Sequence, residues 1–325
     1  MNGTIAVCCL SIAALAADVP KESPTVAQIQ NYVHTVANMD KAIDFYTNAM
    51  GLRINAPPFG AAPTDRLTSR PQLDATTNTP GSTFRPTYFR LPGHDDWGLE
   101  LLQFGNIESH PVEVRIQDPG ASMLILRLRN LDEMLGRLKS GGATVVTPGG
   151  APVMLSGSRC ILLKDLDGMY IQLEQAKAIP PAKATPSAAP KGNILGAKVS
   201  VTVDDTAKTA HFYRDLMGFY LDSTRPAEKS LGQLLGTPGV EILKTTAKLW
   251  GTSFEMEFLE FKGTGRRPIH PRMQDPGAPQ FTIYFKDQPG AIRMFQQEGT
   301  PFLGTSTIWD PNGILILVRA PFPFY

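Results

Sequence analysis

The chain has 325 residues, of which 42% are hydrophobic and 19% are charged, so it can bury sizeable cores and is not a disordered polymer. This length allows two domains of about 150 residues each, or one large domain. The formal net charge is +1, and the sequence has no basic stripe with interleaved aromatic residues, so we expect no nucleic-acid partner.

An apolar run near the start of the chain extends from Ile5 to Ala17 and ends in small residues before Asp18. It is too short to span a bilayer comfortably and resembles the core and cleavage site of a secretory signal peptide, although no Lys or Arg precedes it. We therefore predict a signal peptide at residues 1–17, a secreted or periplasmic location, and no integral membrane segment after its removal. The alternative is a frayed apolar N-terminus or a misassigned start. Cleavage would leave Cys160 as the single cysteine, and its apolar neighbours predict a buried, inert thiol.

One stretch of sequence occurs twice, as Asn31–Gly51 and as Lys198–Gly218. In each copy an alternating segment predicts a strand, a polar residue follows, and a helical segment leads through Phe-Tyr to Met-Gly. The polar residue suits a helix N-cap because its side-chain oxygen can accept from a free amide, and the glycine suits a left-handed C-terminal cap. The predicted caps are Asn38, Asp205, Gly51 and Gly218.

Two further motifs also occur twice, in the same order. Arg-x-Gln-Asp-Pro-Gly-Ala occupies 115–121 and 272–278, and Asp-x-Asp/Asn-Gly occupies 165–168 and 310–313. The first motif predicts a turn whose Arg pairs with the nearby Asp, and an anion site is the alternative.

A segment rich in Pro, Ala and Lys lies between the two copies and predicts an exposed, semi-rigid linker at 176–193. The chain is therefore predicted to hold two homologous domains, residues 24–175 and 194–325.

Each predicted domain divides again into two similar units. After the first Asp-Pro-Gly we predict strands at 123–128, 144–147, 158–163 and 169–174 and a helix at 130–140. After the second we predict strands at 280–285, 305–309 and 314–318 and a helix near 290–297. The unit is strand-helix-strand-strand-strand, four times over. It indicates an α+β fold in which each sheet covers its helices with one face and curls the other around a cavity.

A long segment rich in Pro, Thr and Gly, residues 56–98, interrupts the first unit. Segments of this length inside compact domains are often lids or binding loops. Because it precedes the strand that carries Glu100, we expect it to close over the first cavity.

The ordered motifs Phe45–Gly51, Leu99–Leu101 and Asp165–Gln172, with their counterparts in the second half, resemble the vicinal oxygen chelate superfamily. This superfamily includes glyoxalase I, bleomycin-resistance proteins, fosfomycin-resistance enzymes and extradiol dioxygenases. The resemblance implies four βαβββ modules paired into two cup-shaped domains, each of which completes its own cup, so that a monomer suffices. It also implies a divalent metal held by four side chains, usually His and Glu, that face the cup.

The resemblance assigns the four metal-ligand positions residue by residue. They are Asn31, Glu100, Met123 and Gln172 in the first domain and Lys198, Glu257, Gln280 and Leu317 in the second. Neither set suits a metal, because a hard cation prefers several charged oxygens and a borderline cation prefers imidazole. We therefore expect no metal cofactor. The alternative is Fe, Mn, Ni or Zn on Asn31, Glu100 and Gln172, joined by His34 if a bulge turns it into the cup. Without a bulge, His34 lies on the opposite face, under the helix.

A carboxylate in a cup without a cation is costly unless it is paired. We therefore predict an ion pair between Lys198 and Glu257, and we predict that Arg127 reaches Glu100. The alternative for Glu100 is a raised pKa that suits a general base. The predicted ligand-binding residues are Asn31, Val33, Thr35, Glu100, Met123, Arg127 and Gln172 in the first cup, and Lys198, Ser200, Glu255, Glu257, Gln280 and Leu317 in the second.

Three classes of function remain open. The first, which the missing metal ligands favour, is a metal-free protein that binds a small organic molecule in its first cup, as the bleomycin-resistance branch does. The second is an enzyme, either a metal-dependent lyase, isomerase or dioxygenase built on Glu100 and Gln172 or a metal-free enzyme with Glu100 as base. The third is a structural or interaction protein whose cups are filled by side chains.

Overall fold

The computed structural model describes residues 22–56, 64–175, 177, 192–263 and 265–321. The predicted signal peptide at 1–17 and most of the predicted linker at 176–193 lie outside the described residues. No helix in the described residues combines the length and the hydropathy needed to cross a bilayer.

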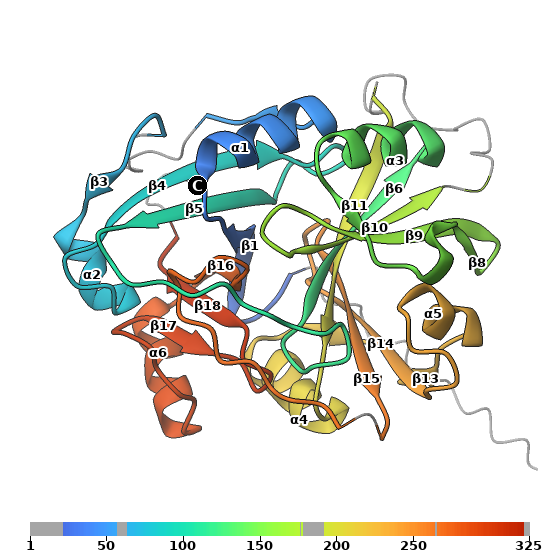
Figure 1. Ribbon diagram of the computed structural model, residues 1–325. Coiled ribbons are helices and arrows are strands. Elements are labelled where there is room, and N and C mark those ends of the chain that lie inside the picture. Colours follow the sequence, from blue (N-terminus) through green and yellow to red (C-terminus); the bar gives the residue numbers. More distant parts are fainter. Residues whose placement is uncertain (1–21, 57–63, 176, 178–191, 264, 322–325) are drawn as a thin grey trace, which may run out of the picture.

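The strands form two sheets, which occupy the left-hand and right-hand parts of Figure 1. Sheet A has the order β17 (Thr307–Trp309), β18 (Leu315–Arg319), β16 (Pro279–Phe285), β1 (Val26–Thr35), β5 (Gly98–Gly105), β4 (Thr83–Arg90) and β2 (Arg53–Ile54), with β3 (Thr68–Ser69) paired to β4. Sheet B has the order β12 (Tyr220–Leu221), β14 (Ile242–Lys248), β15 (Glu255–Phe261), β11 (Ile194–Thr202), β6 (Ser122–Leu128), β10 (Tyr170–Gln175), β9 (Ser158–Lys164) and β7 (Thr144–Val145), with β13 (Arg225–Pro226) paired to β14 and β8 (Val153–Leu155) paired to β9.

The helices belong to two groups. Those that follow the first strand of a module are α1 (Met39–Asp44) with its π-helical continuation η1 (Phe45–Ala49), α3 (Leu131–Ser140), α4 (Thr206–Ala210) with its continuation η3 (His211–Leu216), and α6 (Gln288–Gln297). The shorter ones lie between later strands and are α2 (Pro71–Thr77), the 3-10 turn η2 (Pro148–Gly150) and α5 (Lys229–Leu234).

The predicted caps are confirmed at both copies of the repeated stretch. Asn38 Oδ1 accepts from the amide of Lys41 at 3.0 Å, and Asp205 Oδ1 accepts from two amides of the first turn of α4. Gly51 and Gly218 have φ angles of 83° and 74°, where a residue with a Cβ atom would be strained. The sequence therefore sets both ends of these helices locally.

The four modules pair differently from the prediction. Strand β1 of the first module pairs antiparallel with β16 of the fourth, and β6 of the second pairs antiparallel with β11 of the third. Sheet A therefore belongs to modules one and four, and sheet B to modules two and three. Four modules in two cup-shaped sheets are confirmed, but the prediction that each half completes its own cup is wrong. Both cups close only when the two halves combine.

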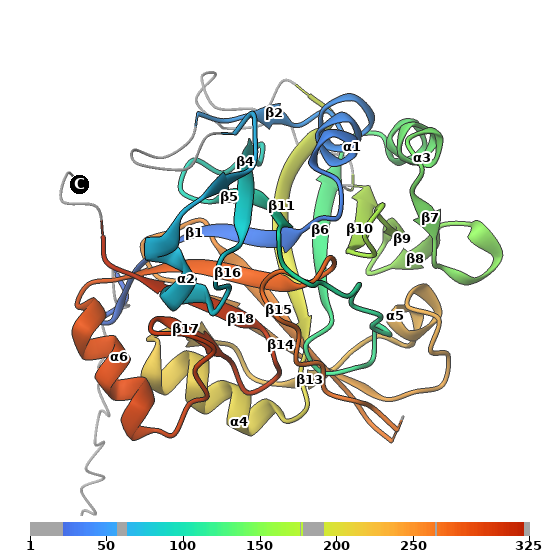
Figure 2. The ribbon, with the colours of Figure 1, turned by 60° about the vertical axis from the view of Figure 1, so that its left-hand side comes forward.

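The helices, in contrast, pair within each half of the chain. Arg137 Nη2 of α3 donates to the carbonyl of Asn48 in η1 at 2.8 Å. Phe212 of η3 stacks on Phe295 of α6 with ring centroids 5.5 Å apart. Figure 2 shows the two resulting helix pairs at opposite ends of the molecule. Buried side chains from both sheets and from these helices form one continuous core, so the halves are joined by apolar packing as well as by strand pairing.

The repeated Asp-Pro-Gly motifs lie in the two segments that cross between the sheets, 106–121 and 262–278. Asp118 binds its own Arg115 at 2.6 Å and also accepts the amide of Arg267, from the other crossing segment, at 3.0 Å. The matching contacts of Asp275 are with Arg272 at 2.8 Å and with the amide of His110 at 2.9 Å. These contacts support the structural interpretation of the motif, because each Asp joins the two crossing segments.

The Phe-Tyr and Asp-x-Asp/Asn-Gly motifs meet in the interior of each half. Tyr46 Oη donates to Asp165 Oδ2 at 2.7 Å, and Tyr213 Oη donates to Asp310 Oδ2 at 3.0 Å. Cys160 is buried, and burial raises the pKa of its thiol to about 12, in agreement with the prediction of an inert thiol.

Candidate functional site

The concave face of sheet A carries a cavity of about 470 Å³, which we call cavity A. It lies between strands of the first and fourth modules. Its apolar lining includes Leu73, Phe84, Leu102, Phe104, Met273 and Leu317. Pockets of this size with a mostly apolar lining and a few polar groups are typical of sites for small organic molecules.

One buried carboxyl group, that of Glu100, lines cavity A and is 8% exposed. Its Oε2 accepts from Asn31 Nδ2 at 2.9 Å, and Tyr88, directly opposite on β4, also hydrogen-bonds to it. Burial raises the pKa of Glu100 to about 7, although Asn31, Arg319 and Tyr88 favour the charged form. Glu100 is thus poised to change its charge near neutral pH.

The predicted contact between Arg127 and Glu100 is wrong. Arg127 lies on β6 of sheet B, whereas Glu100 lies on β5 of sheet A. The cation whose charge acts on Glu100 is Arg319, at the end of β18, which also lines cavity A.

The predicted insert contributes part of the wall of cavity A through α2 and the residues that follow it. Two contacts tie α2 to the fourth module: the amide of Thr305 donates to Ala75 O at 2.9 Å, and Thr307 Oγ1 donates to Thr76 O at 2.7 Å. The described part of the insert therefore bridges from the first module to the edge of the fourth.

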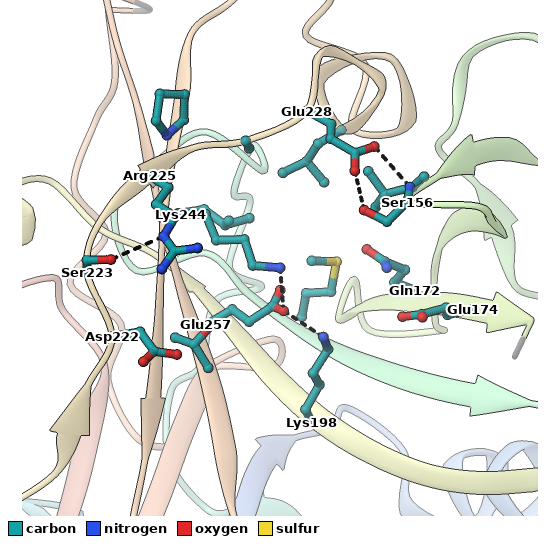
Figure 3. Close-up of a pocket in the computed structure, with 17 residues that line it drawn as sticks. Ser156, Gln172, Glu174, Lys198, Asp222, Ser223, Arg225, Glu228, Lys244 and Glu257 are labelled. Atoms are coloured by element: carbon teal, nitrogen blue, oxygen red, sulfur yellow. Dashed lines mark hydrogen bonds and ion pairs between the residues drawn. The ribbon is translucent and has the colours of Figure 1, made fainter. Parts of the chain in front are cut away.

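The concave face of sheet B carries a second cavity of about 520 Å³, which we call cavity B. Lys198 Nζ and Lys244 Nζ each lie 2.6 Å from the same oxygen of Glu257, Oε1 (Figure 3). The predicted ion pair between Lys198 and Glu257 is confirmed, and Lys244 joins it as a second ammonium.

The pairing of the modules redistributes the eight assigned metal-ligand positions. Asn31, Glu100, Gln280 and Leu317 now share sheet A, and Met123, Gln172, Lys198 and Glu257 share sheet B. The prediction that Gln280 lies beside Lys198 is therefore wrong. Instead, Gln280 Nε2 donates to Thr35 Oγ1 at 2.9 Å and to Met273 O at 3.2 Å.

Neither new set of four suits a divalent metal. The set in sheet A has one carboxyl group and an aliphatic side chain, and the set in sheet B has an ammonium bound to its only carboxylate. A divalent cation in either cup would lack the charged oxygens or imidazoles that hold such ions. Within the described residues, no three His, Cys, Asp or Glu side chains are grouped to hold a metal ion.

His34 lies on the opposite face of β1 from the cup, under the helix. Its Nε2 is 3.3 Å from Asp165 Oδ2, and both side chains are 1% exposed. The alternative in which a bulge turns His34 into the cup is therefore wrong for this structure, although β1 does show a register shift between Ile29 and Asn31.

Four further residues were predicted to line the cups: Val33 and Thr35 in the first cup, and Ser200 and Glu255 in the second. Val33 is buried, and Thr35 Oγ1 donates to Met273 O at 2.8 Å. Ser200 is directly paired with both Met123 and Glu257, but it is buried and is not among the residues that line cavity B. Glu255, which was predicted as a second carboxylate of the cup, pairs with Lys248 at 3.6 Å.

Three important residues were missed by the sequence analysis. Arg319 lies two residues after Leu317, so strand alternation alone places both on one face. Tyr88 belongs to an alternating stretch, but Pro86 in that stretch argued against a central strand. Lys244 lies on β14, which was not predicted, and nothing in its local sequence indicated that it meets Glu257.

Two cup-shaped sheets, each built from two βαβββ modules and each with a cavity on its concave face, define a glyoxalase-like class of proteins. Residues 28–173 match the sequence model of the Glyoxalase/Bleomycin resistance protein/Dioxygenase superfamily. The chain therefore carries a domain of that superfamily at residues 28–173.

Two solved structures share the fold over most of the chain. Glyoxalase I from Zea mays is 15% identical, with a TM-score of 0.55, and the alignment covers 90% of this chain and 92% of that one. A putative dioxygenase from Bacillus subtilis is 13% identical, with a TM-score of 0.52, and the alignment covers 92% of this chain and 86% of that one. At these identities the similarity establishes the fold alone. The comparison with curated protein sequences gave no match.

Proposed function

We propose that this is an exported protein that binds a small organic molecule in cavity A without a metal at the position usual for the superfamily. The observation that carries the proposal is a cavity of about 470 Å³ with an aromatic and aliphatic lining and a single buried carboxyl group, Glu100. The matched superfamily includes bleomycin resistance proteins, and the export is inferred from the apolar run at 5–17.

The chemistry of the lining indicates what kind of ligand fits. Phe84 and Phe104 have ring centroids 6.2 Å apart on neighbouring strands and offer faces to a flat apolar group. Glu100, Tyr88 and Arg319 together supply one polar end. We therefore propose a partly aromatic molecule with one polar substituent that meets Glu100. The presence of two cavities argues against the third class of function, in which side chains fill the cups.

Substitution of Leu317 by Trp is expected to weaken ligand binding at least about tenfold, which corresponds to ~1.4 kcal/mol. Leu317 lines cavity A and is only partly buried, so the larger side chain fills the cavity with little disturbance of the core. The measurement is calorimetric titration with hits from a thermal-shift screen of aromatic fragments, in the presence and absence of EDTA.

Leu155→Trp is the matched control, because Leu155 lines cavity B and the substitution is the same. It should leave the affinity of these fragments unchanged. Binding that responds to Leu155→Trp and not to Leu317→Trp would exclude cavity A. Stoichiometric Fe, Mn, Ni or Zn in protein purified without chelators would contradict the metal-free part of the proposal.

A second candidate function is metal-free proton transfer with Glu100 as base, and the raised pKa of about 7 favours it. This raised pKa makes the free energy of unfolding depend on pH. A raised folded-state pKa favours the protonated carboxyl, so the free energy of unfolding falls as the pH rises from about 4.5 to about 7. The shift from 4.5 to about 7 corresponds to about 3 kcal/mol.

Glu100→Gln removes this titration, and its amide oxygen can still accept from Asn31. The variant is therefore expected to match the wild type near pH 4.5 and to be more stable above pH 7 by about 3 kcal/mol. Urea unfolding of both proteins between pH 4.5 and 8 measures the difference. A constant difference across that range would show that Glu100 titrates normally and would remove the support for its role as a base.

A further inference from the structure

Cavity B differs from cavity A in that charged side chains surround its centre (Figure 3). Lys198, Glu257 and Lys244 project from β11, β15 and β14 of the third module, and Gln172 approaches from β10 of the second module. The cavity therefore exists only where the two modules meet.

The ammonium groups of Lys198 and Lys244 converge on a single carboxylate oxygen, Oε1 of Glu257, at 2.6 Å each. Each ammonium has three donors, and this contact uses one of them. The Lys198 and Lys244 side chains are 27% and 38% exposed, so part of each faces the open cavity. Within this cluster, two positive charges face the one negative charge of Glu257, so the cluster keeps free donors and a net positive charge. The lining as a whole has three positive and four negative side chains, so the cluster is a local positive centre in a cavity with one excess negative charge.

Lys198 and Glu257 keep their charges at neutral pH. Burial alone would lower the pKa of the Lys198 ammonium, but the charge and hydrogen bond of Glu257 outweigh burial and leave that pKa raised. Burial likewise opposes ionisation of Glu257, and the charges of Lys198 and Lys244 hold its pKa below the usual range. A protonated Lys198 is an electrostatic binding group rather than a nucleophile.

The remaining charged groups of the cavity are Glu174, Asp222, Arg225 and Glu228, and they have other contacts. Asp222 forms a hydrogen bond with Tyr220. Glu228 at the mouth accepts from the amide of Ser156 at 2.9 Å and from the Ser156 hydroxyl. Arg225 Nε donates to Ser223 Oγ at 3.1 Å and adds a third positive charge to the wall. Glu174, beside Gln172, acts on Lys198 only through its charge.

Gln172 provides a hydrogen-bond acceptor that complements the donors of the two lysines. Its side chain is 3% exposed and lines cavity B, and its Oε1 has no hydrogen-bond partner among the described residues. A buried acceptor without a donor is unfavourable, so a ligand that brings a donor to this atom gains binding free energy.

We propose that cavity B is a second ligand site, which binds a small organic acid that carries a hydroxyl or amino group. Its carboxylate binds the free donors of Lys198 and Lys244, and its hydroxyl or amino group donates to Gln172 Oε1. Lys198 and Glu257 occupy two of the positions that the resemblance to the superfamily assigns to metal ligands. Cavity B is separate from cavity A. Binding of an organic acid in cavity B does not depend on the aromatic ligand proposed for cavity A.

The experiment titrates the full chain by calorimetry with lactate and serine, which carry a carboxylate and a donor, with propionate, which carries only the carboxylate, and with inorganic phosphate. Lactate or serine should bind at least about fivefold more tightly than propionate, because propionate leaves Gln172 without a donor. Lys244→Met should weaken that binding about tenfold or more. Glu257→Gln should strengthen it, because a competing carboxylate is removed from both ammonium groups.

Lys248→Met is the matched control, since Lys248 lies on the same strand β14 but pairs with Glu255 and does not line the cavity. It should bind the acids like the wild type, and so should Leu317→Trp in cavity A. The proposal is overturned if no acid binds, if Lys244→Met and Lys248→Met have equal effects, or if Glu257→Gln weakens binding in a folded protein. Tighter binding of phosphate than of either organic acid would overturn the assignment of the ligand class.

Discussion

Each half of the chain, expressed alone as residues 22–175 or 192–325, is expected not to fold as a monomer. The first half would lose β16 as the partner of β1 and β11 as the partner of β6, which leaves a long central strand edge exposed in each of its two modules. It would also lose half of the continuous core. Size-exclusion chromatography with light scattering should show aggregates or self-associated species for each half, and a one-to-one complex when the halves are refolded together.

Cleavage of the intact protein within the predicted linker at 176–193 is the matched control. The two strand pairings and the crossing contacts of Asp118 and Asp275 do not use this segment. The cut protein should therefore remain a single particle with the mass of both halves. A half that is monomeric, cooperative in unfolding and stable on its own would contradict the shared sheets.

Substitution of Asp165 by Asn is expected to destabilise the protein by about 3 kcal/mol at pH 7. Asp165 is buried and accepts from Tyr46 Oη, and His34 Nε2 lies 3.3 Å from it. Burial opposes its ionisation, but His34, Tyr46 and the amide of Met169 outweigh burial and lower its pKa. An amide has the shape of the acid but cannot supply the charge that these groups stabilise.

Asp310→Asn provides the comparison, because Asp310 holds the same position in the second half and accepts from Tyr213 Oη at 3.0 Å. The residue that corresponds to His34 there is Val201, so no imidazole faces this carboxyl group. Burial raises the pKa of Asp310, which means that its neutral form fits the site. The neutral amide should therefore cost only about 1 kcal/mol.

The pH dependence has opposite signs for the two variants. A lowered pKa gives stability that is present above about pH 4 and is lost as the pH falls further, so the deficit of Asp165→Asn should shrink in acid. A raised pKa works the other way, so Asp310→Asn should compare least favourably with the wild type in acid. Urea unfolding of both variants at pH 3 to 7 provides the measurement, and equal deficits at pH 7 would rule out the role of His34.

Most of the local structure could be predicted because its determinants lie close together in the sequence. The N-caps at Asn38 and Asp205 and the glycine ends of the helices depend on contacts within one helical turn. Strand alternation placed β6, β9, β10, β16 and β18 to within a residue or two. The arginine–aspartate pairs of the Asp-Pro-Gly motifs are also local, at a spacing of three residues.

The candidate sites were predicted only in part. The ion pair of Lys198 and Glu257 was predicted because the resemblance assigns both residues to ligand positions of one metal. It holds in the structure because both residues belong to one module. The prediction that Arg127 contacts Glu100 was wrong because it assumed that the first two modules share a sheet. Lys244 was missed because the sequence of β14 shows no clear strand alternation. Its contact with Glu257 depends on the position of its ammonium group in the tertiary structure.

Local sequence patterns were enough to predict the module, its caps, its turns and its fourfold repetition, and the residue types at the assigned cup positions already departed from a usual metal-ligand set. Which modules share a sheet could be read only from the three-dimensional arrangement. All four modules begin with a similar strand, so either pairing would satisfy the same local patterns. The choice rests on contacts between residues more than a hundred positions apart, such as those of Asp118 with Arg267 and of β1 with β16. That choice brought Arg319 of the fourth module to Glu100 in cavity A, and Gln172 of the second module to the two lysines in cavity B.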